Sequence, residues 1–165
     1  MPTPDFVLEL RRHIGHTPIP LVGVTAVILR AAGAAEDGVE VLMGRRSDTG
    51  AWAPISGIVD PGEEPADTAR RESLEEAGVE VVVERMLSVH QVPRITHVNG
   101  DQVDYLDIAF ACRWVSGEAW PADGELTALR WMPVTEAVAT ASEGKRRAIR
   151  LAAAAPAPTV FDTAG

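Results

Sequence analysis

The chain has few of the features that mark secreted or membrane proteins. It contains one cysteine among 165 residues, so no internal disulfide can form, and Cys112 lies in an apolar stretch that favours a packed core thiol. The longest apolar stretch, Pro20 to Leu29, is far below the roughly 20 residues that a membrane helix needs. The first residues lack the apolar core and cleavage site of a secretory signal. We therefore expect a cytoplasmic protein without membrane attachment.

Positive charge is also scarce. Fifteen Lys and Arg residues face 24 Asp and Glu residues, which leaves a formal net charge of −9. Nucleic-acid binding depends largely on basic residues that neutralise phosphates, so we do not expect a nucleic-acid partner. An acidic protein can still bind a phosphorylated small molecule where a bound cation reverses the local field.

Length and periodicity indicate one α/β domain. We expect it to cover residues 1–155, with residues 1–18 as a helical extension and residues 156–165 as a disordered Ala/Pro-rich tail. Apolar spacing and helix stop signals predict four helices, at Asp5 to Ile14, Pro65 to Ala77, Thr135 to Ala141 and Lys145 to Ala153. Runs of strand-forming residues predict strands at Leu21 to Leu29, Val39 to Met43, Val79 to Val83, Met86 to Val92, Val103 to Val115 and Leu129 to Met132. The first two strands should form a hairpin, and Asn99-Gly100 predicts a two-residue hairpin turn.

The helix Pro65 to Ala77 carries two different faces. Small residues recur along one stripe, which allows close packing on a sheet: Ala66, Ala69, Ser73 and Ala77. Glu72, Glu75 and Glu76 project together from another face, which we expect to face solvent. Like charges at this spacing cost about 0.2–0.5 kcal/mol per pair, a cost that a divalent cation with oxygen ligands would offset. An ordinary solvated acidic face is the alternative interpretation of three glutamates alone.

The surrounding residues resemble the Nudix box, G-x5-E-x7-R-E-U-x-E-E-x-G-U, in which U is apolar. The positions that match in register are Gly57, Glu63, Arg71, Glu72, Glu75, Glu76, Gly78 and Val79. Ser73 departs from the pattern at a usually apolar position, and Trp52-Ala-Pro-Ile-Ser-Gly57 replaces the commoner Trp-x-x-Pro-Gly-Gly. The likeness extends more loosely from Val22 to Glu136. It implies a Nudix-like α/β/α sandwich with a mixed central sheet and one catalytic loop-helix.

The resemblance also implies a chemistry: Mg²⁺-dependent, or Mn²⁺-dependent, hydrolysis of a nucleoside diphosphate linked to another group X. Position by position, it assigns metal binding to Glu72, Glu75, Glu76 and the Gly57 carbonyl. Glu72 and Glu76 are then also catalytic candidates, with Glu72 the first choice of general base. Arg71 is expected to orient the carboxylates, because charge-assisted hydrogen bonds are strong.

Several further residues have two interpretations each. Glu63 is expected either to join the metal network or to cap the helix N-terminus. The loop 117–126 resembles one that supplies an extra carboxylate in MutT-like members, so Asp123, Glu125 and Glu118 compete with Glu72 as general base, with an ordinary solvated acidic loop as the alternative. Arg45 and Arg46 are candidates for binding substrate phosphates, with surface salt bridges as the alternative.

Three classes of function compete. The first is a nucleotide pyrophosphohydrolase, acting on ADP-ribose or another nucleotide derivative, and it is favoured because no box glutamate is missing. Within this class a MutT-like nucleoside triphosphate pyrophosphatase is the main rival; Pro93 weakly favours ADP-ribose, because it lies one residue short of the spacing in ADP-ribose-cleaving members. The second class is a Nudix-fold binding module without catalysis. The third is an isopentenyl diphosphate isomerase, which we discount because that family uses a catalytic cysteine, whereas Cys112 lies in a predicted strand well after the box. The N-terminal helix has an apolar face that could cover the sheet or form a homodimer.

Overall fold

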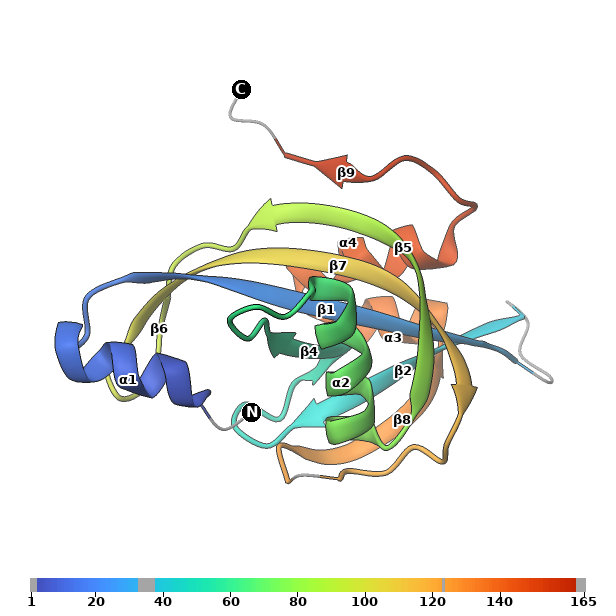
Figure 1. Ribbon diagram of the computed structural model, residues 1–165. Coiled ribbons are helices and arrows are strands. Elements are labelled where there is room, and N and C mark those ends of the chain that lie inside the picture. Colours follow the sequence, from blue (N-terminus) through green and yellow to red (C-terminus); the bar gives the residue numbers. More distant parts are fainter. Residues whose placement is uncertain (1–2, 33–37, 123, 163–165) are drawn as a thin grey trace.

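The fold is a mixed sheet with helices on both sides. The computed structural model describes residues 3–32, 38–122 and 124–162, which form nine strands and four helices (Figure 1). The helices are α1 (Asp5–Ile14), α2 (Pro65–Ala77), α3 (Val134–Thr140) and α4 (Glu143–Ala153). The strands are β1 (Ile19–Ala31), β2 (Val39–Arg46), β3 (Trp52–Ala53), β4 (Ile55–Ile58), β5 (Glu80–Gln91), β6 (Ile95–Thr96), β7 (Gln102–Ser116), β8 (Leu126–Pro133) and β9 (Val160–Phe161).

Two long strands organise the sheet. The main strand order is β3-β2-β1-β7-β5-β9, in which β1 and β7 run parallel over eleven paired residues, from Ile19↔Val103 to Leu29↔Arg113. Strand β4 pairs antiparallel with β1, β8 with β2, and β6 with β7. The expected mixed central sheet is therefore confirmed, as is the antiparallel pairing of β1 with β2.

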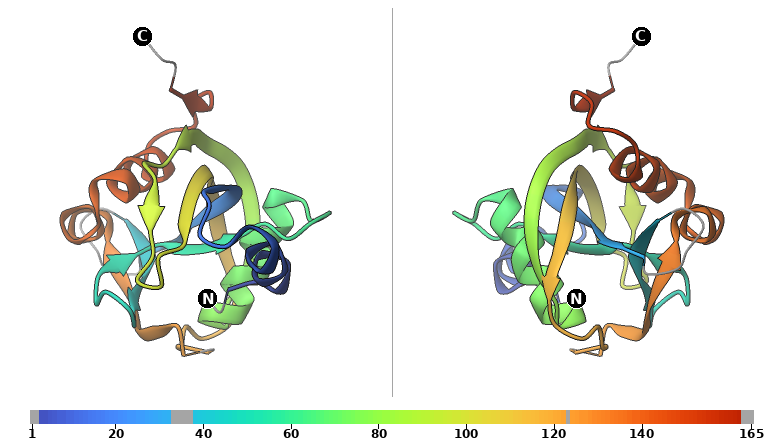
Figure 2. Two further views of the ribbon diagram at one scale, coloured as in Figure 1. Left: turned by 90° about the vertical axis from the view of Figure 1, so that its left-hand side faces the viewer. Right: turned by 90° about the vertical axis from the view of Figure 1, so that its right-hand side faces the viewer.

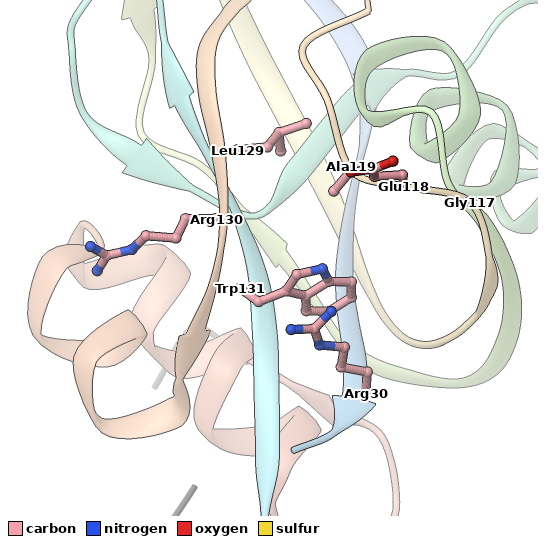
Figure 3. A pocket seen from close by; sticks show the side chains of 7 residues that line it. All are labelled: Arg30, Gly117, Glu118, Ala119, Leu129, Arg130 and Trp131. Carbon is pink, nitrogen blue, oxygen red and sulfur yellow. The ribbon is translucent and has the colours of Figure 1, made fainter. Parts of the chain in front are cut away.

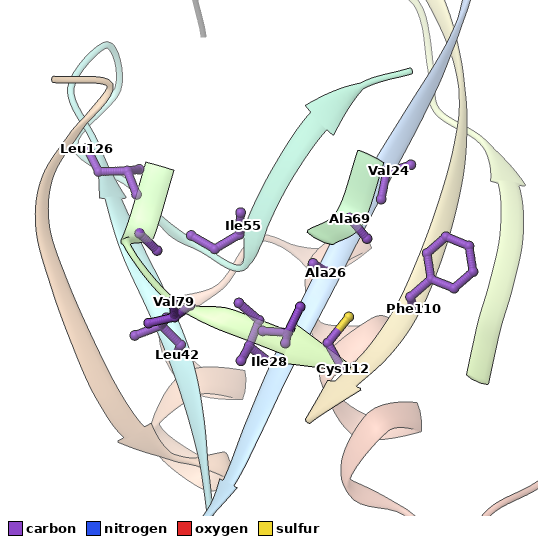
Figure 4. Packing of buried hydrophobic residues seen from close by; sticks show 12 residues of the cluster. Val24, Ala26, Ile28, Leu42, Ile55, Ala69, Val79, Phe110, Cys112 and Leu126 are labelled. Atoms are coloured by element: carbon purple, nitrogen blue, oxygen red, sulfur yellow. The ribbon is translucent and has the colours of Figure 1, made fainter. Parts of the chain in front are cut away.

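Helices cover the two faces of the sheet separately. Helix α2 packs on one face over a cluster that includes Ile28, Leu42 and Val79 (Figure 4). Helices α3 and α4 lie on the opposite face, and α1 lies at one end of the sheet (Figures 1 and 2). Cys112 belongs to the α2-side cluster, and burial raises the pKa of its thiol to about 12, which confirms the predicted core thiol. No helix of the described ranges is long and apolar enough to span a membrane.

The predicted helices α1 and α2 begin and end at the expected residues, but two strand predictions need correction. The stretches predicted as two strands, Val79 to Val83 and Met86 to Val92, form the single strand β5. Irregular pairing with β7 between Val83 and Arg85, and again between Met86 and Ser88, breaks the side-chain alternation that sequence analysis depends on. Arg85, at the first of these irregularities, donates to the Leu151 and Ala152 carbonyls at the end of α4.

The predicted two-residue turn at Asn99-Gly100 is wrong. The last ladder pair of the β6–β7 hairpin is Thr96↔Gln102, and the His97 N–H still donates to the Asp101 carbonyl at 2.8 Å, so three residues, Val98, Asn99 and Gly100, form the loop. A two-residue type I′ turn needs two residues with positive φ, whereas here only Gly100, at φ 88°, has one. The Asn99 side chain instead accepts a hydrogen bond from the Asp101 backbone at 3.1 Å.

The C-terminal segment also differs from the expected disordered tail. Val160 and Phe161 form β9, which pairs in parallel with Ser88 and Val89 of β5. Thr159 donates to the Met86 carbonyl at 3.1 Å, which fixes the segment just before the strand. Backbone pairing at a sheet edge can order a short segment of weak composition, a long-range effect that composition does not report. The expected domain boundaries stay a prediction.

Two glycines give a stability test of the helix ends. Gly78 ends α2 at φ 66°, donates to the Leu74 carbonyl, and would place an added Cβ 2.6 Å from Trp120 Nε1. Gly144 lies in the first turn of α4, and an added Cβ there would meet no atom within 4 Å. We expect Gly78→Ala to lower the free energy of unfolding by more than about 1 kcal/mol, and Gly144→Ala to raise it by about 0.5 kcal/mol. Denaturant unfolding measures both, and equal effects would contradict the two assigned environments.

Candidate active site

Helix α2 presses one carboxylate against the strand β4. Gly57 of β4 pairs with Val24 of β1, and its Cα faces α2. A Cβ built on Gly57 would lie 2.1 Å from Glu72 Oε1, which is shorter than any real contact. The Glu72 side chain therefore occupies the place of the missing Gly57 side chain. This contact explains in physical terms why glycine stands at this position.

Arg71 connects this carboxylate to two others. Its guanidinium donates to Glu63 through Nε at 2.9 Å and Nη2 at 2.9 Å, which is a bidentate pair. Nη1 donates to Glu72 Oε1 at 2.8 Å and to Glu75 Oε2 at 3.0 Å. A further bond joins Nη2 to the Ile58 carbonyl of β4 at 3.2 Å. Arg71 thus lies in the carboxylate cluster, as predicted, and ties it to the strand.

Of the two roles expected for Glu63, the structure does not support the cap at the N-terminus of α2. Its carboxylate accepts from Arg71, from the Thr68 hydroxyl at 2.7 Å and from the Asp60 backbone at 3.3 Å. The guanidinium of Arg71 is the main reason why the pKa of Glu63 falls to about 2. The residue at the N-cap of α2 is Glu64, without a side-chain capping bond, so Glu63 belongs to the Arg71 network. The sequence separation of Glu63 and Thr68 did not predict the hydrogen bond between their side chains.

The expectation that the glutamate face points to solvent is wrong for two of its members. Glu72 is 3% exposed and Glu76 is 4% exposed, whereas the Glu75 side chain is 54% exposed. Because residues follow one another at about 100° around a helix, Glu72 and Glu76 border the buried stripe that contains Ser73 and Ala77. Ser73 is buried and donates to the Ala69 carbonyl at 2.6 Å, so its hydroxyl is satisfied inside that stripe.

Burial sets the protonation of Glu72. Loss of hydration raises its pKa to about 7, and the neighbouring charge of Arg71 opposes that rise without cancelling it. Glu63 and Glu72 contact the same guanidinium, yet their pKa values move in opposite directions. Hydration therefore distinguishes two carboxylates that the motif alone treats alike.

A loop closes the C-terminal end of α2. The backbone N–H groups of Trp120 and Ala122 donate to the Ala77 and Glu76 carbonyls, both at 3.2 Å. These bonds satisfy helix carbonyls that have no partner within the helix. Trp120 and Ala122 thus lie beside the C-terminal end of α2, next to Glu76.

The carboxylates of that loop are placed only in part. Asp123 lies outside the described residues. The Glu125 carbonyl accepts from the Ser47 backbone at 2.8 Å, which joins this loop to the loop after β2. Glu118 lines a separate cavity beside β8.

The two arginines at the end of β2 differ in their surroundings. Arg46 forms a bidentate pair with Asp48 at 2.7 and 2.9 Å, and this is the main cause of its raised pKa. The negative charge of Glu76 contributes to the same rise, so Arg46 lies within electrostatic reach of α2. Arg45 is exposed and donates through Nε to the Gly50 carbonyl at 3.3 Å. Arg46 thus forms the salt bridge that was the alternative to phosphate binding, with Asp48 as its partner. Its charge still interacts with that of Glu76.

The donor set suits a hard divalent cation. Glu72 and Glu75 both contact Arg71 Nη1, so their oxygens converge on one point, and carboxylate oxygens are preferred Mg²⁺ ligands. Within the described ranges, no three His, Cys, Asp or Glu side chains are already grouped to enclose an ion. Cation binding would therefore require Arg71 Nη1 or the glutamate side chains to rearrange.

A cavity of about 440 Å³ lies between the ends of β1 and β8 and the residues that follow β7 (Figure 3). It is lined by Arg30, by residues 117–119 and by residues 129–131 of β8. The Arg30 guanidinium lies 4.2 Å from the centre of the Trp131 ring, so the aromatic face is already covered. The cavity contains none of the glutamates predicted for metal binding.

Comparisons with known proteins agree with the fold. No curated protein sequence matches the chain. A solved ADP-ribose pyrophosphatase from Streptococcus suis is similar at a TM-score of 0.62 and 21% identity, over 87% of this chain and 100% of that one. A MutT protein from Methanosarcina mazei has a TM-score of 0.60 and 22% identity, over 82% and 94%. A C. elegans Ap4A hydrolase has a TM-score of 0.61 and 19% identity, over 79% and 93%.

The family assignment comes from the sequence itself. The model of the NUDIX domain matches residues 20–152, which is most of the chain and includes α2, the loop 117–125 and nearly all of β1 and α4. Five of the residues that the Nudix box had identified are joined by contacts among β4, the loop after it and α2: Gly57, Glu63, Arg71, Glu72 and Glu75. The chain belongs to the NUDIX domain family.

Proposed function

We propose that the protein is a Mg²⁺-dependent pyrophosphohydrolase that cleaves a nucleoside diphosphate linked to X into a nucleoside monophosphate and phospho-X. The observation that carries the proposal is the packing of Glu72 on Gly57 with Arg71 tied to Glu63, Glu72 and Glu75. A binding module would have no need to bury two glutamates at the cost that desolvated charge entails. Membership of a family of pyrophosphate-bond hydrolases supports the same conclusion.

The residues have separable tasks in this mechanism. Glu72, Glu75, Glu76 and the Gly57 carbonyl would hold the cation, which supplies charge neutralisation and acidifies a bound water. Arg71 fixes the orientation of the carboxylates through its bonds to them. The cluster excludes bulk water on the side of β4, which strengthens each electrostatic interaction there. Arg46, and Arg45 beside it, bring positive charge to the side where substrate phosphates would lie.

Two kinds of pyrophosphohydrolase differ in their substrate: one cleaves nucleoside diphosphate derivatives, and the other, MutT-like, cleaves nucleoside triphosphates. Similar structures carry ADP-ribose pyrophosphatase, Ap4A hydrolase and MutT in their names, so the fold alone does not select. Pro93 favours a nucleoside diphosphate derivative, whereas the acidic loop after β7 is the feature shared with MutT-like proteins. A panel of ADP-ribose, sugar nucleotides, dinucleoside polyphosphates and nucleoside triphosphates separates them by the products released.

Metal dependence is the first test of the proposal. Complete removal of divalent ions should abolish hydrolysis of every compound in the panel, and Mg²⁺ or Mn²⁺ should restore it. Saturating Mg²⁺ should also raise the melting temperature, because it binds only the folded state. Turnover that persists after verified metal removal would contradict the proposal.

The glutamates can be tested with isosteric substitutions. Glu72→Gln and Glu76→Gln should each lower turnover by about a thousandfold, equivalent to roughly 4 kcal/mol of transition-state stabilisation. Near-normal turnover in both variants at saturating Mg²⁺ would exclude the metal-site assignment. Circular dichroism of the metal-free variants provides the control for folding.

The raised pKa of Glu72 gives a pH test on the metal-free protein. Its folded pKa of about 7 lies above the ordinary value of 4.5, so the folded state holds this proton more strongly than the unfolded state. This stabilising effect is fully present below pH 4.5 and is lost as pH rises to about 7. Glu72→Gln should therefore gain stability relative to the parent protein across that window. A constant difference in the free energy of unfolding from pH 4.5 to 7 would contradict the assigned burial of this carboxyl group.

The contact between Gly57 and Glu72 can be disrupted from the strand side. Gly57→Ala should displace the carboxylate, because the new Cβ would overlap it, and turnover should fall by about a hundredfold, as for a misplaced catalytic group. Gly144→Ala is the matched control, since the same methyl group there meets open space. Equal turnover in the two variants would mean that Glu72 does not need its position against β4.

A further inference from the structure

The four tryptophans, all of which lie in the described ranges, differ in how their rings are used. Trp114 and Trp131 form an edge-to-face pair with centroids 6.4 Å apart, and Arg30 covers Trp131. Trp52 packs against the core cluster on the side of α3 and α4. Trp120 is 57% exposed. Tryptophan is highly buried on average, so an indole held at the surface needs an explanation.

Trp120 is held in a defined place. Its backbone N–H bonds to the Ala77 carbonyl, and two residues later Ala122 bonds to Glu76, so both ends of the segment are attached to α2. Its indole lies directly on Gly78, where a Cβ would come within 2.6 Å of Nε1 and 2.8 Å of Cδ1. The glycine that ends the helix therefore also makes room for the ring. Ordering a side chain costs conformational entropy when a ligand binds. Because Trp120 is already held against α2, that entropy cost on ligand binding is reduced.

The position of the ring matches the length of a nucleotide. Gly78 follows Arg71 by seven residues, which is about 10 Å along a helix of about 1.5 Å rise per residue. Arg71 and Gly78 lie two turns apart along α2, with Glu75 between them. A ligand extended along α2 with its pyrophosphate at the carboxylate cluster would bring its far end to Trp120. In a nucleoside diphosphate that far end is the base.

We propose that Trp120 is the platform on which the nucleobase of the substrate stacks. The inference rests on the proposed function, and it adds that recognition uses the nucleoside half of the substrate. Base stacking on an aromatic ring tolerates different bases because every base has a π-face. Trp120 would accordingly give affinity for nucleotides as a class, and other groups would select among them.

The experiment compares three variants of the full chain with the parent protein. Trp120→Ala removes the ring, Trp120→Phe keeps an aromatic face, and Leu74→Ala removes an apolar side chain that is 54% exposed on the same helix. KM and kcat are measured with the best nucleotide of the panel and with a diphosphate ester that lacks a base. We expect Trp120→Ala to raise the KM of the nucleotide about tenfold, within the range for stacking of one base, with kcat nearly unchanged. Trp120→Phe should recover much of the loss, and Leu74→Ala should leave KM unchanged.

A second readout does not depend on turnover. Adenosine monophosphate should quench the tryptophan fluorescence of the parent protein and should quench that of Trp120→Phe much less. An unchanged KM in Trp120→Ala, an equal rise in KM for the base-free ester, or equal quenching in both proteins would overturn the platform. A fall in both kcat and melting temperature that Phe does not reverse would show a structural role and would also overturn it. If the parent protein hydrolysed no compound, the proposed function would fail, and the quenching comparison would still decide the nucleobase site.

Discussion

The guanidinium of Arg71 is the interaction on which the rest of the site depends. It satisfies oxygens of Glu63, Glu72 and Glu75 and also bonds to the Ile58 carbonyl, so one side chain joins the loop before α2, the helix itself and the strand β4. Removing one partner of a partly buried ion network leaves uncompensated charge, which costs more than the network contributes. A lysine could not replace it, because a single ammonium lacks the planar fork that forms bidentate pairs in several directions.

This arrangement keeps acidic groups close together in a fold that already carries excess negative charge. Glu72 and Glu76 are buried at the border between the small-residue stripe of α2 and the open side of the helix. The fold tolerates Glu72 partly because its pKa rises to about 7, so that the metal-free protein can hold it neutral near that pH. A cation would instead favour the charged form, because metal binding requires deprotonated ligands. Metal and proton are therefore expected to compete for the same carboxylate.

The sequence predicted the parts that follow from local rules. Both ends of α2 were predicted correctly from Pro65 at the first helical position and Gly78 directly after the last one. The motif spacing also predicted that Arg71 lies beside the carboxylates. Long-range contacts were beyond these rules. The burial of Glu72 depends on Gly57 from another element, the irregular pairing of β5 depends on β7, and β9 depends on the free edge of β5. The fork between Arg46 and Asp48 and the exposed position of Trp120 likewise had no signal in the spacing of residues.

The end of α2 joins the structural and chemical parts of the protein. Its terminal carbonyls bond to the loop 117–122, and the same loop continues to Glu125, whose carbonyl bonds to Ser47 beside Arg46. The glutamate helix, the arginine loop and the exposed indole are consequently held by one set of backbone bonds. Backbone bonds of this kind do not depend on the side chains of Trp120 and Ala122, whereas Gly117 is fixed by packing, because a Cβ there would overlap the Gly78 carbonyl. A site built in this way can change the part that recognises its ligand without altering the carboxylate cluster that Arg71 holds.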